Sequence, residues 1–364
     1  MKTYPIPMVP GPVRVPPQVF EAYCTDYGSS DLEIEFLELY NCTEANLQKL
    51  FTTQNHVVIQ TGEGMLALWT ALKSCLLPGD RVLSIASGVF GYGIGEMAQS
   101  IGAKVRTISL PYDQTISNWQ EIEQAIAEFQ PKMITVVHCE TPSGTLNPLE
   151  KLGQLKKKHA VPLLYVDAVA SVGGTPVLVD DWQIDLALGG SQKALSVPPA
   201  LSFLAVSETA WEIIEKVNYV GYEALKPFRT AQQNFYFPYT PYWHGIAALN
   251  TGAELVLQEG LQACFERHTM IAEYCRQRLT EIGYQLFPAP SAIPSPTVTA
   301  VYVPDGITWK EFDRKLRQRG LAVGGSYGPL AGRVFRLGHM GTQANRELVD
   351  QALNILEDVL DEIR

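Results

Sequence analysis

The stretch Leu163-Leu164-Tyr165-Val166-Asp167 decides the fold class of this chain. Four apolar residues in a row, closed by one carboxylate, are typical of a β-strand that is buried on both faces. Strands of this kind lie in parallel sheets whose two faces are covered by helices. The stretch therefore predicts an α/β domain and places Asp167 at the carboxyl end of a strand, where open α/β sheets bind their ligands.

Similar short runs alternate with helical patterns through the first two-thirds of the chain. We expect strands at Val57–Gln60, Arg81–Ala86, Lys104–Leu110, Met133–His138, Pro162–Asp167, Leu186–Gly189 and Leu201–Val206. Segments with helical periodicity lie between most of them, at Gly64–Leu77, Trp119–Phe129 and Leu149–His159. This alternation predicts a mostly parallel sheet flanked by helices.

The pattern changes from about residue 241. The expected elements there are a long helical stretch, then strands and helices in turn: Ile246–Leu286, Thr297–Val303, Trp309–Arg319, Leu321–Gly324, Val334–Leu337 and a last helix from Gln343. We therefore expect an N-terminal extended segment (1–18), a large domain (19–245) and a small C-terminal α+β domain (246–364).

The bulk properties exclude several classes of protein. The 364 residues have a formal net charge of -10, which argues against binding to nucleic acid or to an anionic membrane. No apolar run approaches the roughly 20 residues that span a bilayer, and no apolar signal-peptide region is visible. The six cysteines form no CxxC motif, which favours reduced thiols in a cytoplasmic protein. The six histidines show no metal-binding spacing, so we expect no metal site.

Lys193 is the strongest candidate for a reactive residue. It follows the expected strand Leu186–Gly189 in the run Gly190-Ser191-Gln192-Lys193, so it too lies just past a strand end. A lysine amine in a partly dry cavity can lose its proton and attack a carbonyl, which is Schiff-base chemistry. Asp167 could then pair with a protonated ring nitrogen. The alternatives are a solvated loop lysine and an aspartate that caps a turn.

Four further segments carry candidate binding residues. The turn Thr61-Gly62-Glu63-Gly64-Met65 could hold a phosphate on backbone amides at a helix N-terminus, provided that the Glu63 side chain turns away or has another partner. Phe90 could stack on a flat cofactor, and Thr141 could bond a ring hydroxyl or a phosphate. Arg336 lies inside an apolar strand and needs an anionic partner, either a substrate carboxylate or an internal salt bridge. The first three features could equally be a glycine turn, a core aromatic and a proline turn.

Together these residues resemble the class V aminotransferases of pyridoxal-phosphate fold type I, and within them the alanine–glyoxylate and serine–pyruvate/glyoxylate group. The resemblance covers nearly the whole chain and rests on six motifs in family order: Val9-Pro10-Gly11-Pro12, Thr61-Gly62-Glu63-Gly64, Glu140-Thr141-Pro142-Ser143-Gly144, Val166-Asp167-Ala168-Val169-Ala170-Ser171, Gly190-Ser191-Gln192-Lys193 and Arg336-Leu337-Gly338-His339-Met340-Gly341. It implies a large cofactor-binding domain, a smaller α+β domain and pyridoxal 5'-phosphate as the cofactor.

The resemblance also implies roles for single residues. Lys193 would form the Schiff base, and Asp167 would pair with the pyridine nitrogen. The implied cofactor-binding residues are Glu63, Gly64, Met65, Phe90, Thr141, Asp167, Gln192, Lys193, Tyr239 and Thr240. The implied substrate-binding residues are Gly11, Glu63 and Arg336, with Arg336 on the substrate carboxylate. Tyr239 and Thr240 lie in the segment that would reach the phosphate of a neighbouring subunit, which implies a homodimer with active sites at its interface.

The resemblance predicts an aminotransferase that moves an amino group from alanine or serine to glyoxylate or pyruvate. Two departures bear on the substrate. Glu63 stands where family members often carry a small residue, and a glutamate there is similar to pyridoxamine–pyruvate aminotransferase. The segment Asp26-Tyr27-Gly28-Ser29-Ser30 lacks the usual His-Arg-Ser pattern of the family. Pyridoxamine–pyruvate transamination is therefore the alternative activity.

Other functions compete with this interpretation. A cysteine desulfurase usually has a histidine directly before the lysine, where this chain has Gln192, and it needs a mobile cysteine, but none follows Cys275. A nicotinamide-dependent dehydrogenase is suggested by Gly93-Ile94-Gly95-Glu96-Met97-Ala98, which matches GxGxxA but lies beyond the tight turn that this motif requires. A catalytically silent binding protein of the same fold is a third possibility.

Overall fold

A seven-stranded sheet forms the centre of the molecule, and the computed structural model describes residues 3–364 around it. Residues 1–2 of the expected N-terminal segment lie outside the described residues. The strand order is β2-β10-β9-β8-β5-β3-β4. The strands are β2 His56–Thr61, β3 Arg81–Ala86, β4 Lys104–Ser109, β5 Met133–Val137, β8 Leu163–Asp167, β9 Leu186–Gly190 and β10 Leu201–Val206. Only β10 runs antiparallel to its neighbours in this sheet, so the predicted mostly parallel sheet is confirmed.

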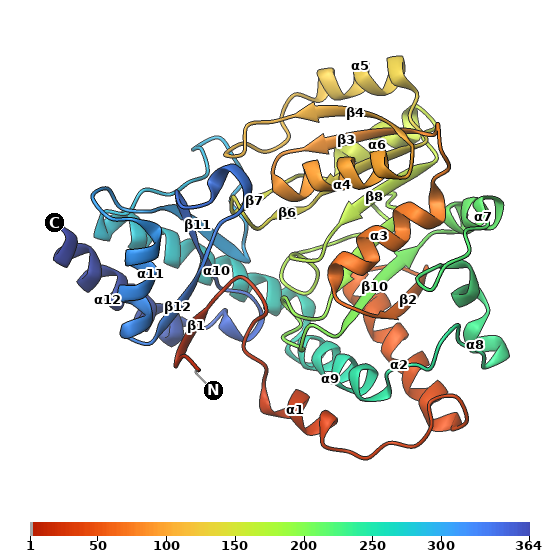
Figure 1. Cartoon of the computed structure of the whole chain (residues 1–364), viewed down its shortest axis with the longest axis horizontal. Coiled ribbons are helices and arrows are strands. Elements are labelled where there is room, and N and C mark those ends of the chain that lie inside the picture. The colour runs from red at the N-terminus through yellow and green to blue at the C-terminus, as the bar shows by residue number, and fades with distance from the viewer. Residues whose placement is uncertain (1–2) are drawn as a thin grey trace.

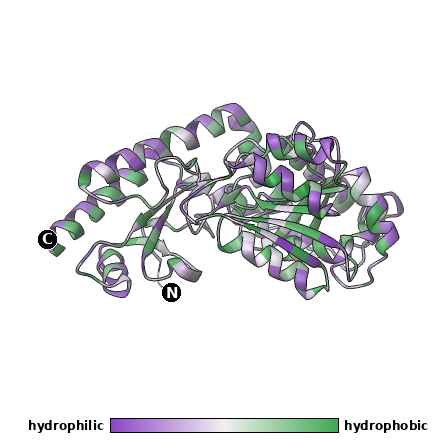
Figure 2. Cartoon of the chain, turned by 90° about the horizontal axis from the view of Figure 1, so that it is seen from above, coloured by the Kyte–Doolittle hydropathy of each residue, from purple (hydrophilic) through white to green (hydrophobic). Residues whose placement is uncertain are grey.

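Strand β8 lies in the middle of the sheet because its side chains are apolar on both faces. Leu163 to Val166 have no exposed surface, and helices cover the sheet as Figure 1 shows. These helices are α2 Ile34–Phe51, α3 Gly64–Cys75, α4 Val89–Ser100, α5 Trp119–Phe129, α6 Glu150–Lys158, α7 Glu208–Val217 and α9 Trp243–Glu259. Figure 2 shows the hydrophobic strands enclosed by helices with hydrophilic outer sides. Strands β8 and β9 are parallel, so the segments that follow Asp167 and Gly190 leave the sheet at the same edge.

A second, four-stranded sheet forms the C-terminal part, in the order β1-β12-β13-β11. Its elements are β1 Ile6–Met8, β11 Val298–Tyr302, β12 Leu321–Gly325 and β13 Val334–Gly338, with helices α10 Leu261–Ile282, α11 Trp309–Gln318 and α12 Arg346–Ile363. Strand β1 pairs in parallel with β12. The start of the chain therefore belongs to the packing of the C-terminal part, with Ile6 and Met8 in its hydrophobic core.

The junction between the two parts differs from the single helical stretch expected at Ile246–Leu286. Two helices, α9 and α10, meet at Gly260, whose φ of +89° ends the first helix. Helix α9 packs in the core of the large sheet, and α10 packs in the second core from Ile271 onward. The division into 1–18, 19–245 and 246–364 stays a proposal; these two cores are the observation that supports a large and a small part.

Short elements complete the fold. They are helix α1 Pro17–Tyr23, helix α8 Ala231–Asn234 and the hairpin of β6 Cys139–Glu140 with β7 Thr145–Leu146. The hairpin follows β5 at the ligand-binding edge of the large sheet. It brings Cys139, Glu140 and Thr141 to that edge.

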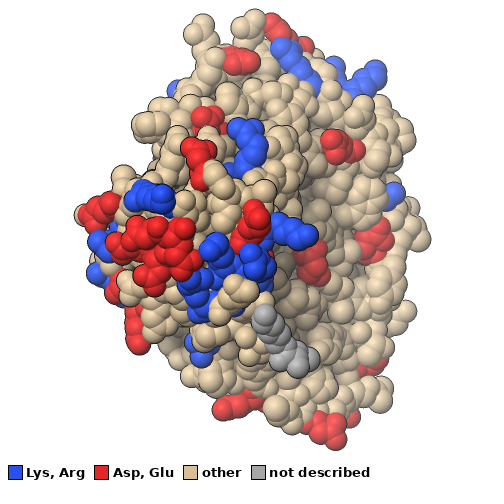
Figure 3. All heavy atoms as spheres, turned by 60° about the vertical axis from the view of Figure 1, so that its left-hand side comes forward, with Lys and Arg blue, Asp and Glu red and all other residues tan. Residues whose placement is uncertain are grey.

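The surface of the C-terminal part mixes acidic and basic side chains. Figure 3 shows both kinds side by side on the face that this part forms. Ion pairs there include Lys315 Nζ to Glu362 Oε2 at 3.0 Å and Arg317 Nε to Asp313 Oδ2 at 2.8 Å. Across residues 3–364, no helix is both long enough and apolar enough to cross a membrane.

Candidate active site

Most of the predicted site residues line one cavity at the carboxyl ends of β8 and β9. They are Glu63, Gly64, Met65, Phe90, Thr141, Asp167, Gln192 and Lys193. These residues come from five separate segments of the sequence, so the fold gathers them as the family motifs predicted. Gly11, Arg336, Tyr239 and Thr240 lie outside this lining.

Lys193 projects into the cavity from the loop after β9. Its Nζ donates a hydrogen bond to the Pro10 carbonyl at 2.6 Å. Gly11 lies against the same side chain, because a Cβ at Gly11 would be 2.7 Å from Lys193 Cδ and 2.8 Å from Nζ. Burial, together with the nearby positive charge of Arg336, lowers the pKa of Lys193 to about 8. A larger fraction of the amine is therefore neutral, and nucleophilic, than in an ordinary lysine.

Asp167 ends β8 and points its carboxylate toward the cavity. Its Oδ1 accepts a hydrogen bond from the Val169 N–H at 2.9 Å. Burial raises the pKa of Asp167 to about 6, although the Val169 N–H and the Lys193 charge act in the opposite direction. A buried carboxylate without an ion-pair partner is costly, so a cationic ring nitrogen would be a favourable partner.

Glu63 occupies the N-terminus of α3. Its Oε1 accepts from the Met65 N–H at 3.0 Å, and its Oε2 accepts from the Gln192 amide nitrogen at 3.0 Å. The side chain therefore bonds to the helix start, which was predicted to hold a phosphate, and to Gln192, a predicted cofactor-binding residue. The other Gln192 amide atom, Oε1, is buried and has no hydrogen-bond partner among the described residues.

Arg336 lies on β13 at the border between the two sheets. Its Nε donates to the Gly325 carbonyl at 2.9 Å, and its guanidinium lies 4.7 Å from the centre of the Tyr327 ring. No ion pair joins it to a carboxylate in the part of the chain that the structure describes, which contradicts the internal salt bridge as an alternative. A Cβ at Gly324 would touch both Arg336 Nη2, at 3.3 Å, and Pro10 Cδ, at 2.7 Å. The guanidinium is thus close to the Pro10–Gly11 turn that contacts Lys193.

Tyr239 and Thr240 lie outside the cavity lining and bond to other segments of this chain. The Tyr239 hydroxyl accepts from the Thr61 N–H at 3.0 Å, and its ring stacks on Tyr222 with centroids 4.8 Å apart. Thr240 Oγ1 donates to Asp31 Oδ2 at 3.0 Å. Their predicted contact with a neighbouring subunit stays a prediction.

The cavity contains residues that sequence reasoning did not single out. Cys139, Val169 and Ala170 line it. Glu140 lies directly behind it, fully buried, and accepts from the backbone N–H groups of Phe90 and Gly91. The sequence feature that points to Glu140 is a carboxylate that directly follows an apolar strand and precedes the small residues Thr141 to Gly144.

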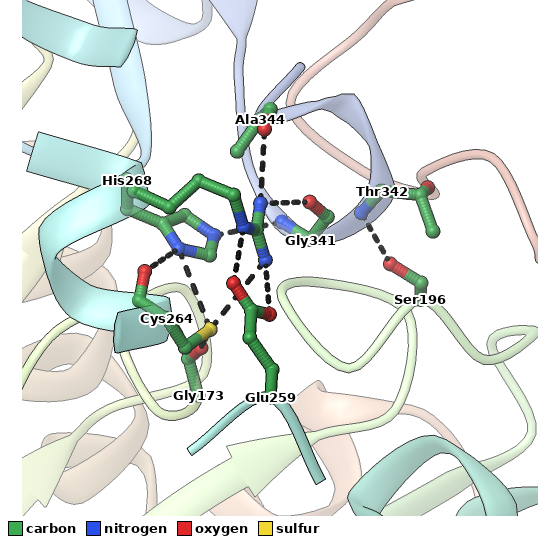
Figure 4. A network of polar contacts seen from close by, with 9 residues as sticks. Gly173, Ser196, Glu259, Cys264, His268, Gly341, Thr342 and Ala344 are labelled. Carbon is green, nitrogen blue, oxygen red and sulfur yellow. Dashed lines mark hydrogen bonds and ion pairs between the residues drawn. The ribbon is translucent and has the colours of Figure 1, made fainter. Parts of the chain in front are cut away.

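A polar network joins the Lys193 loop to the C-terminal part (Figure 4). Arg267 binds both carboxylate oxygens of Glu259 and donates to the carbonyls of Gly341 and Ala344 at 3.0 and 2.9 Å. His268 Nε2 accepts from the Gly341 N–H at 2.9 Å, and burial lowers the pKa of His268 to about 4, so the ring is neutral. Residues of α10 therefore fix the turn after β13. Ser196, in the Lys193 loop, accepts from the Thr342 N–H in that turn at 3.0 Å.

Comparison with known proteins identifies the family. The family described as aminotransferase class-V matches residues 15–333. The chain is 33% identical to the pyridoxamine–pyruvate transaminase of Mesorhizobium japonicum, over 96% of this chain and 90% of that protein. It is 32% identical to the alanine–glyoxylate aminotransferase of Oryctolagus cuniculus, over 96% of this chain and 91% of that protein. This chain is a class-V aminotransferase.

Solved structures agree with this class-V fold. The alanine–glyoxylate aminotransferase of Nostoc sp. matches with a TM-score of 0.94 and 32% identity, over 99% of this chain and 96% of that chain. The pyridoxamine–pyruvate aminotransferase of Mesorhizobium loti matches with a TM-score of 0.95 and 31% identity, over 100% and 93%. The predicted fold type I architecture and transaminase class are therefore confirmed.

The dehydrogenase alternative is wrong. Its motif, Gly93 to Ala98, lies inside α4 rather than in a turn between a strand and a helix. Glycine N–H groups within a helix are bonded to the helix itself and cannot cradle a phosphate. Cys275, the last cysteine, is fully buried on α10, which also disfavours the desulfurase alternative.

Membership of class V implies pyridoxal phosphate as the cofactor. The cavity residues fit the ring of this cofactor but not its phosphate. The ring part fits, because Asp167, Phe90 and Lys193 line one cavity with the apolar side chain of Val169. The phosphate end does not fit while the Glu63 carboxylate is bonded to the Met65 N–H and to Gln192. Two anions would then compete for the same donors.

Proposed function

We propose that this class-V aminotransferase exchanges an amino group between the pyridoxamine–pyridoxal pair, without its phosphate, and a small 2-oxo acid such as pyruvate. The observation that carries this proposal is the Glu63 carboxylate at the N-terminus of α3. The likeness to two pyridoxamine–pyruvate aminotransferases supports it.

The electrostatics of the α3 N-terminus favour a neutral group over a phosphate. The helix end carries about half a positive charge, and one carboxylate already balances it. A second anion at ~4 Å from Glu63 would be repelled by about 4 kcal/mol per unit charge at the effective dielectric of a protein site. The neutral hydroxymethyl group of pyridoxal avoids this repulsion. It can also donate a hydrogen bond, which Glu63 and the unpaired Gln192 Oε1 are able to accept.

The chain's own groups then divide the work of transamination. The bound ring supplies the electron-accepting system, and Asp167 keeps its nitrogen protonated. Lys193 Nζ carries the proton between the Cα of the amino acid and C4′ of the ring, as a base and then an acid. Its lowered pKa of about 8 suits both roles near neutral pH. Arg336 and the Gly11 turn hold the carboxylate of the amino or oxo acid, because a guanidinium binds a carboxylate with two parallel hydrogen bonds.

The second candidate is transfer from alanine or serine to glyoxylate or pyruvate with pyridoxal phosphate as the resident cofactor. The likeness to alanine–glyoxylate aminotransferases favours it. It requires the Glu63 side chain to leave Met65 and Gln192. Both candidates use Lys193, Asp167 and Arg336 in the same roles.

A paired assay separates the two candidates. The purified protein is given pyridoxamine with pyruvate in one series, and pyridoxal phosphate with alanine and glyoxylate in the other. We expect pyridoxal and alanine to form in the first series at the higher rate. Turnover confined to the second series would overturn the proposal in favour of the second candidate. The Lys193→Ala variant should be inactive in both.

Replacing Glu63 tests its proposed effect on the affinity for pyridoxal phosphate. Glu63→Ser frees the Met65 N–H and the Gln192 amide, so affinity for pyridoxal phosphate should rise by about tenfold or more, since a repulsion of several kcal/mol is removed. Affinity for pyridoxal should fall or stay level. Glu63→Gln is the matched control, because it keeps the size of the side chain and removes only its charge. Equal phosphate affinity in all three proteins would contradict the role of Glu63.

We also propose that the protein works as a homodimer in the cytoplasm. An exposed apolar cluster surrounds the segments 17–34 and 219–242, with Phe20, Leu32, Ile34, Tyr222, Tyr236 and Tyr242 each at least 36% exposed. The two segments lie together, since Ser30 Oγ donates to the Pro241 carbonyl at 2.8 Å. Exposed apolar side chains on neighbouring segments favour a protein–protein interface. Tyr222 of this cluster stacks on Tyr239, whose hydroxyl accepts from the Thr61 N–H. All six cysteines are free thiols, which supports the cytoplasmic location.

A further inference from the structure

Glu140 is a fully buried carboxylate that the roles above do not use. It lies in β6, between Cys139 and Thr141, and both of these neighbours line the cavity. Its Oε1 accepts from the Gly91 N–H at 2.7 Å, and its Oε2 accepts from the Phe90 N–H at 3.3 Å. Among the described residues no lysine or arginine bonds to it. The carboxylate is therefore held by backbone groups at the start of α4.

The start of α4 needs an acceptor from elsewhere in the chain. The first N–H groups of a helix have no partner within the helix, and a side chain at the N-cap usually accepts from one of them. The N-cap of α4 is Gly88, which has no side chain and makes no such bond. Glu140 takes this place from a hairpin 50 positions away, and its carboxyl oxygens accept from the N–H groups of Phe90 and Gly91.

The backbone around Glu140 is shaped to admit its side chain. A Cβ at Gly88 would be 2.6 Å from Glu140 Cδ, and a Cβ at Gly91 would be 3.3 Å from Oε1 and 2.9 Å from the Ala86 backbone. Residues with a side chain at these two positions would collide with the carboxyl group or with β3. The two glycines on either side of Phe90 therefore give the carboxylate access to the Phe90 N–H.

Burial of Glu140 strongly affects the pKa of its carboxyl group. It raises the pKa of Glu140 to about 8, an effect that the charge of Asp167 adds to and the two N–H groups oppose. Keeping such a group in the core is unfavourable unless its hydrogen bonds offset the cost. An apolar residue would fill the same space without that cost, so the bonds to Phe90 and Gly91 account for a glutamate here.

We propose that Glu140 is a positioning residue that holds the Phe90 ring against the pyridoxal ring and fixes it relative to Thr141 on the other wall of the cavity. The inference rests on the proposed function in one respect, the stacking role of Phe90. In this role Glu140 touches neither cofactor nor substrate and acts through the backbone of α4.

A double-mutant cycle between Glu140 and Phe90 tests this proposal. The four proteins are wild type, Glu140→Leu, Phe90→Ala and the double variant, and the readouts are the dissociation constant for pyridoxal and the circular dichroism of bound pyridoxal. Glu140→Leu should weaken binding by about tenfold or more, because the buried N–H groups of Phe90 and Gly91 lose their acceptor. In the Phe90→Ala background the same change should cost less than about twofold, since residues that act through one another are not additive. Equal losses in the two backgrounds would overturn the proposal.

Two controls separate positioning from general destabilisation. Glu140→Gln keeps one acceptor oxygen and should restore most of the affinity and of the dichroism that Glu140→Leu loses. If the Glu140→Leu variant does not fold, Glu140→Ala takes its place in the cycle. Asp185→Asn makes the same amide replacement at a buried carboxylate that accepts from the Leu164 N–H at the opposite end of the sheet. It should lower the thermal midpoint and leave the dichroism of bound pyridoxal unchanged. Parallel losses of dichroism in both variants would indicate a purely structural role.

The cycle also distinguishes failure of this inference from failure of the proposed function. The same measurements with pyridoxal phosphate report on Phe90 whichever vitamer is the substrate, because both carry the same ring. If wild type binds only the phosphorylated form, the proposed substrate is wrong while the Glu140 cycle still gives an answer.

Discussion

Among single residues, Asp167 has a proposed role in catalysis that reduces the stability of the folded protein. Asp167 is 6% exposed and its carboxylate accepts from the Val169 N–H, but it forms no ion pair with any of the described residues. Its pKa is raised from 3.8 to about 6. The folded protein therefore binds this proton more tightly than the unfolded chain does. The stability contributed by this group is fully present below pH 3.8 and is lost as the pH rises through about 6.

Asp167→Asn should therefore stabilise the protein without its ring and abolish its activity. The asparagine keeps an acceptor for the Val169 N–H and removes a buried charge that costs on the order of 2–3 kcal/mol at pH 8. Thermal unfolding at pH 8 should show a higher midpoint for the variant, and the gain should shrink at pH 4.5. A variant that is less stable than wild type at pH 8 would show that Asp167 has a stabilising partner.

At the scale of elements, the N-terminal segment and β13 cross at very close range. A Cβ at Gly338 would be 2.6 Å from Pro10 N and closer still to Pro10 Cα and the Val9 carbonyl oxygen. Gln343 holds the same crossing, because its amide donates to the Val9 carbonyl at 2.9 Å and to the Gly338 carbonyl at 2.6 Å. Pro10 in turn accepts from Lys193. The crossing thus sets the position of the group that contacts the reactive amine.

Gly338→Ala should displace the N-terminal segment and reduce turnover. The new methyl group meets backbone atoms, which cannot rotate away, so we expect a stability loss of about 1–3 kcal/mol along with the loss of rate. Steady-state kinetics and thermal unfolding measure the two effects. Gly93→Ala is the matched control: its Cβ would meet nothing within 4 Å in α4, so it should be neutral or stabilising by about 0.5–1 kcal/mol. Full activity in Gly338→Ala would refute the role of the crossing.

In the whole molecule, the large sheet and the four-stranded sheet have separate cores, joined by polar contacts and by a small apolar cluster in which Ala170 and Ala194 meet Val298 and Met340. Arg267, which also binds Glu259, and His268 both bond to the turn after β13. Ser196 links that turn to the Lys193 loop (Figure 4). Arg336 and Lys193 come from different cores, so their separation depends on this joint. The exposed apolar cluster lies on the large part, where its Tyr222 stacks on Tyr239.

Leu32→Glu should convert the proposed homodimer into monomers. Leu32 is 76% exposed in the single chain, and a charge at the centre of an apolar interface would be buried without a partner. Size-exclusion chromatography with light scattering measures the mass. Met270→Glu, a change at a residue that is 62% exposed on α10, is the control and should leave the dimer intact. A monomeric wild type, or a dimeric Leu32→Glu variant, would count against this interface.

Sequence alone was enough to predict the alternation of strands and helices, the strand ends that carry Asp167 and Lys193, and the family. These features depend on local hydrophobic periodicity and on the order of short motifs, which can be read along the chain. Three features became visible in the folded chain: β1 joins the C-terminal sheet, Glu63 bonds to Met65 and Gln192, and Glu140 serves as the cap of α4. The physical reason is that the partner of a hydrogen-bonding side chain is set by distance in space, and Glu140 meets Gly91 across 49 positions of sequence.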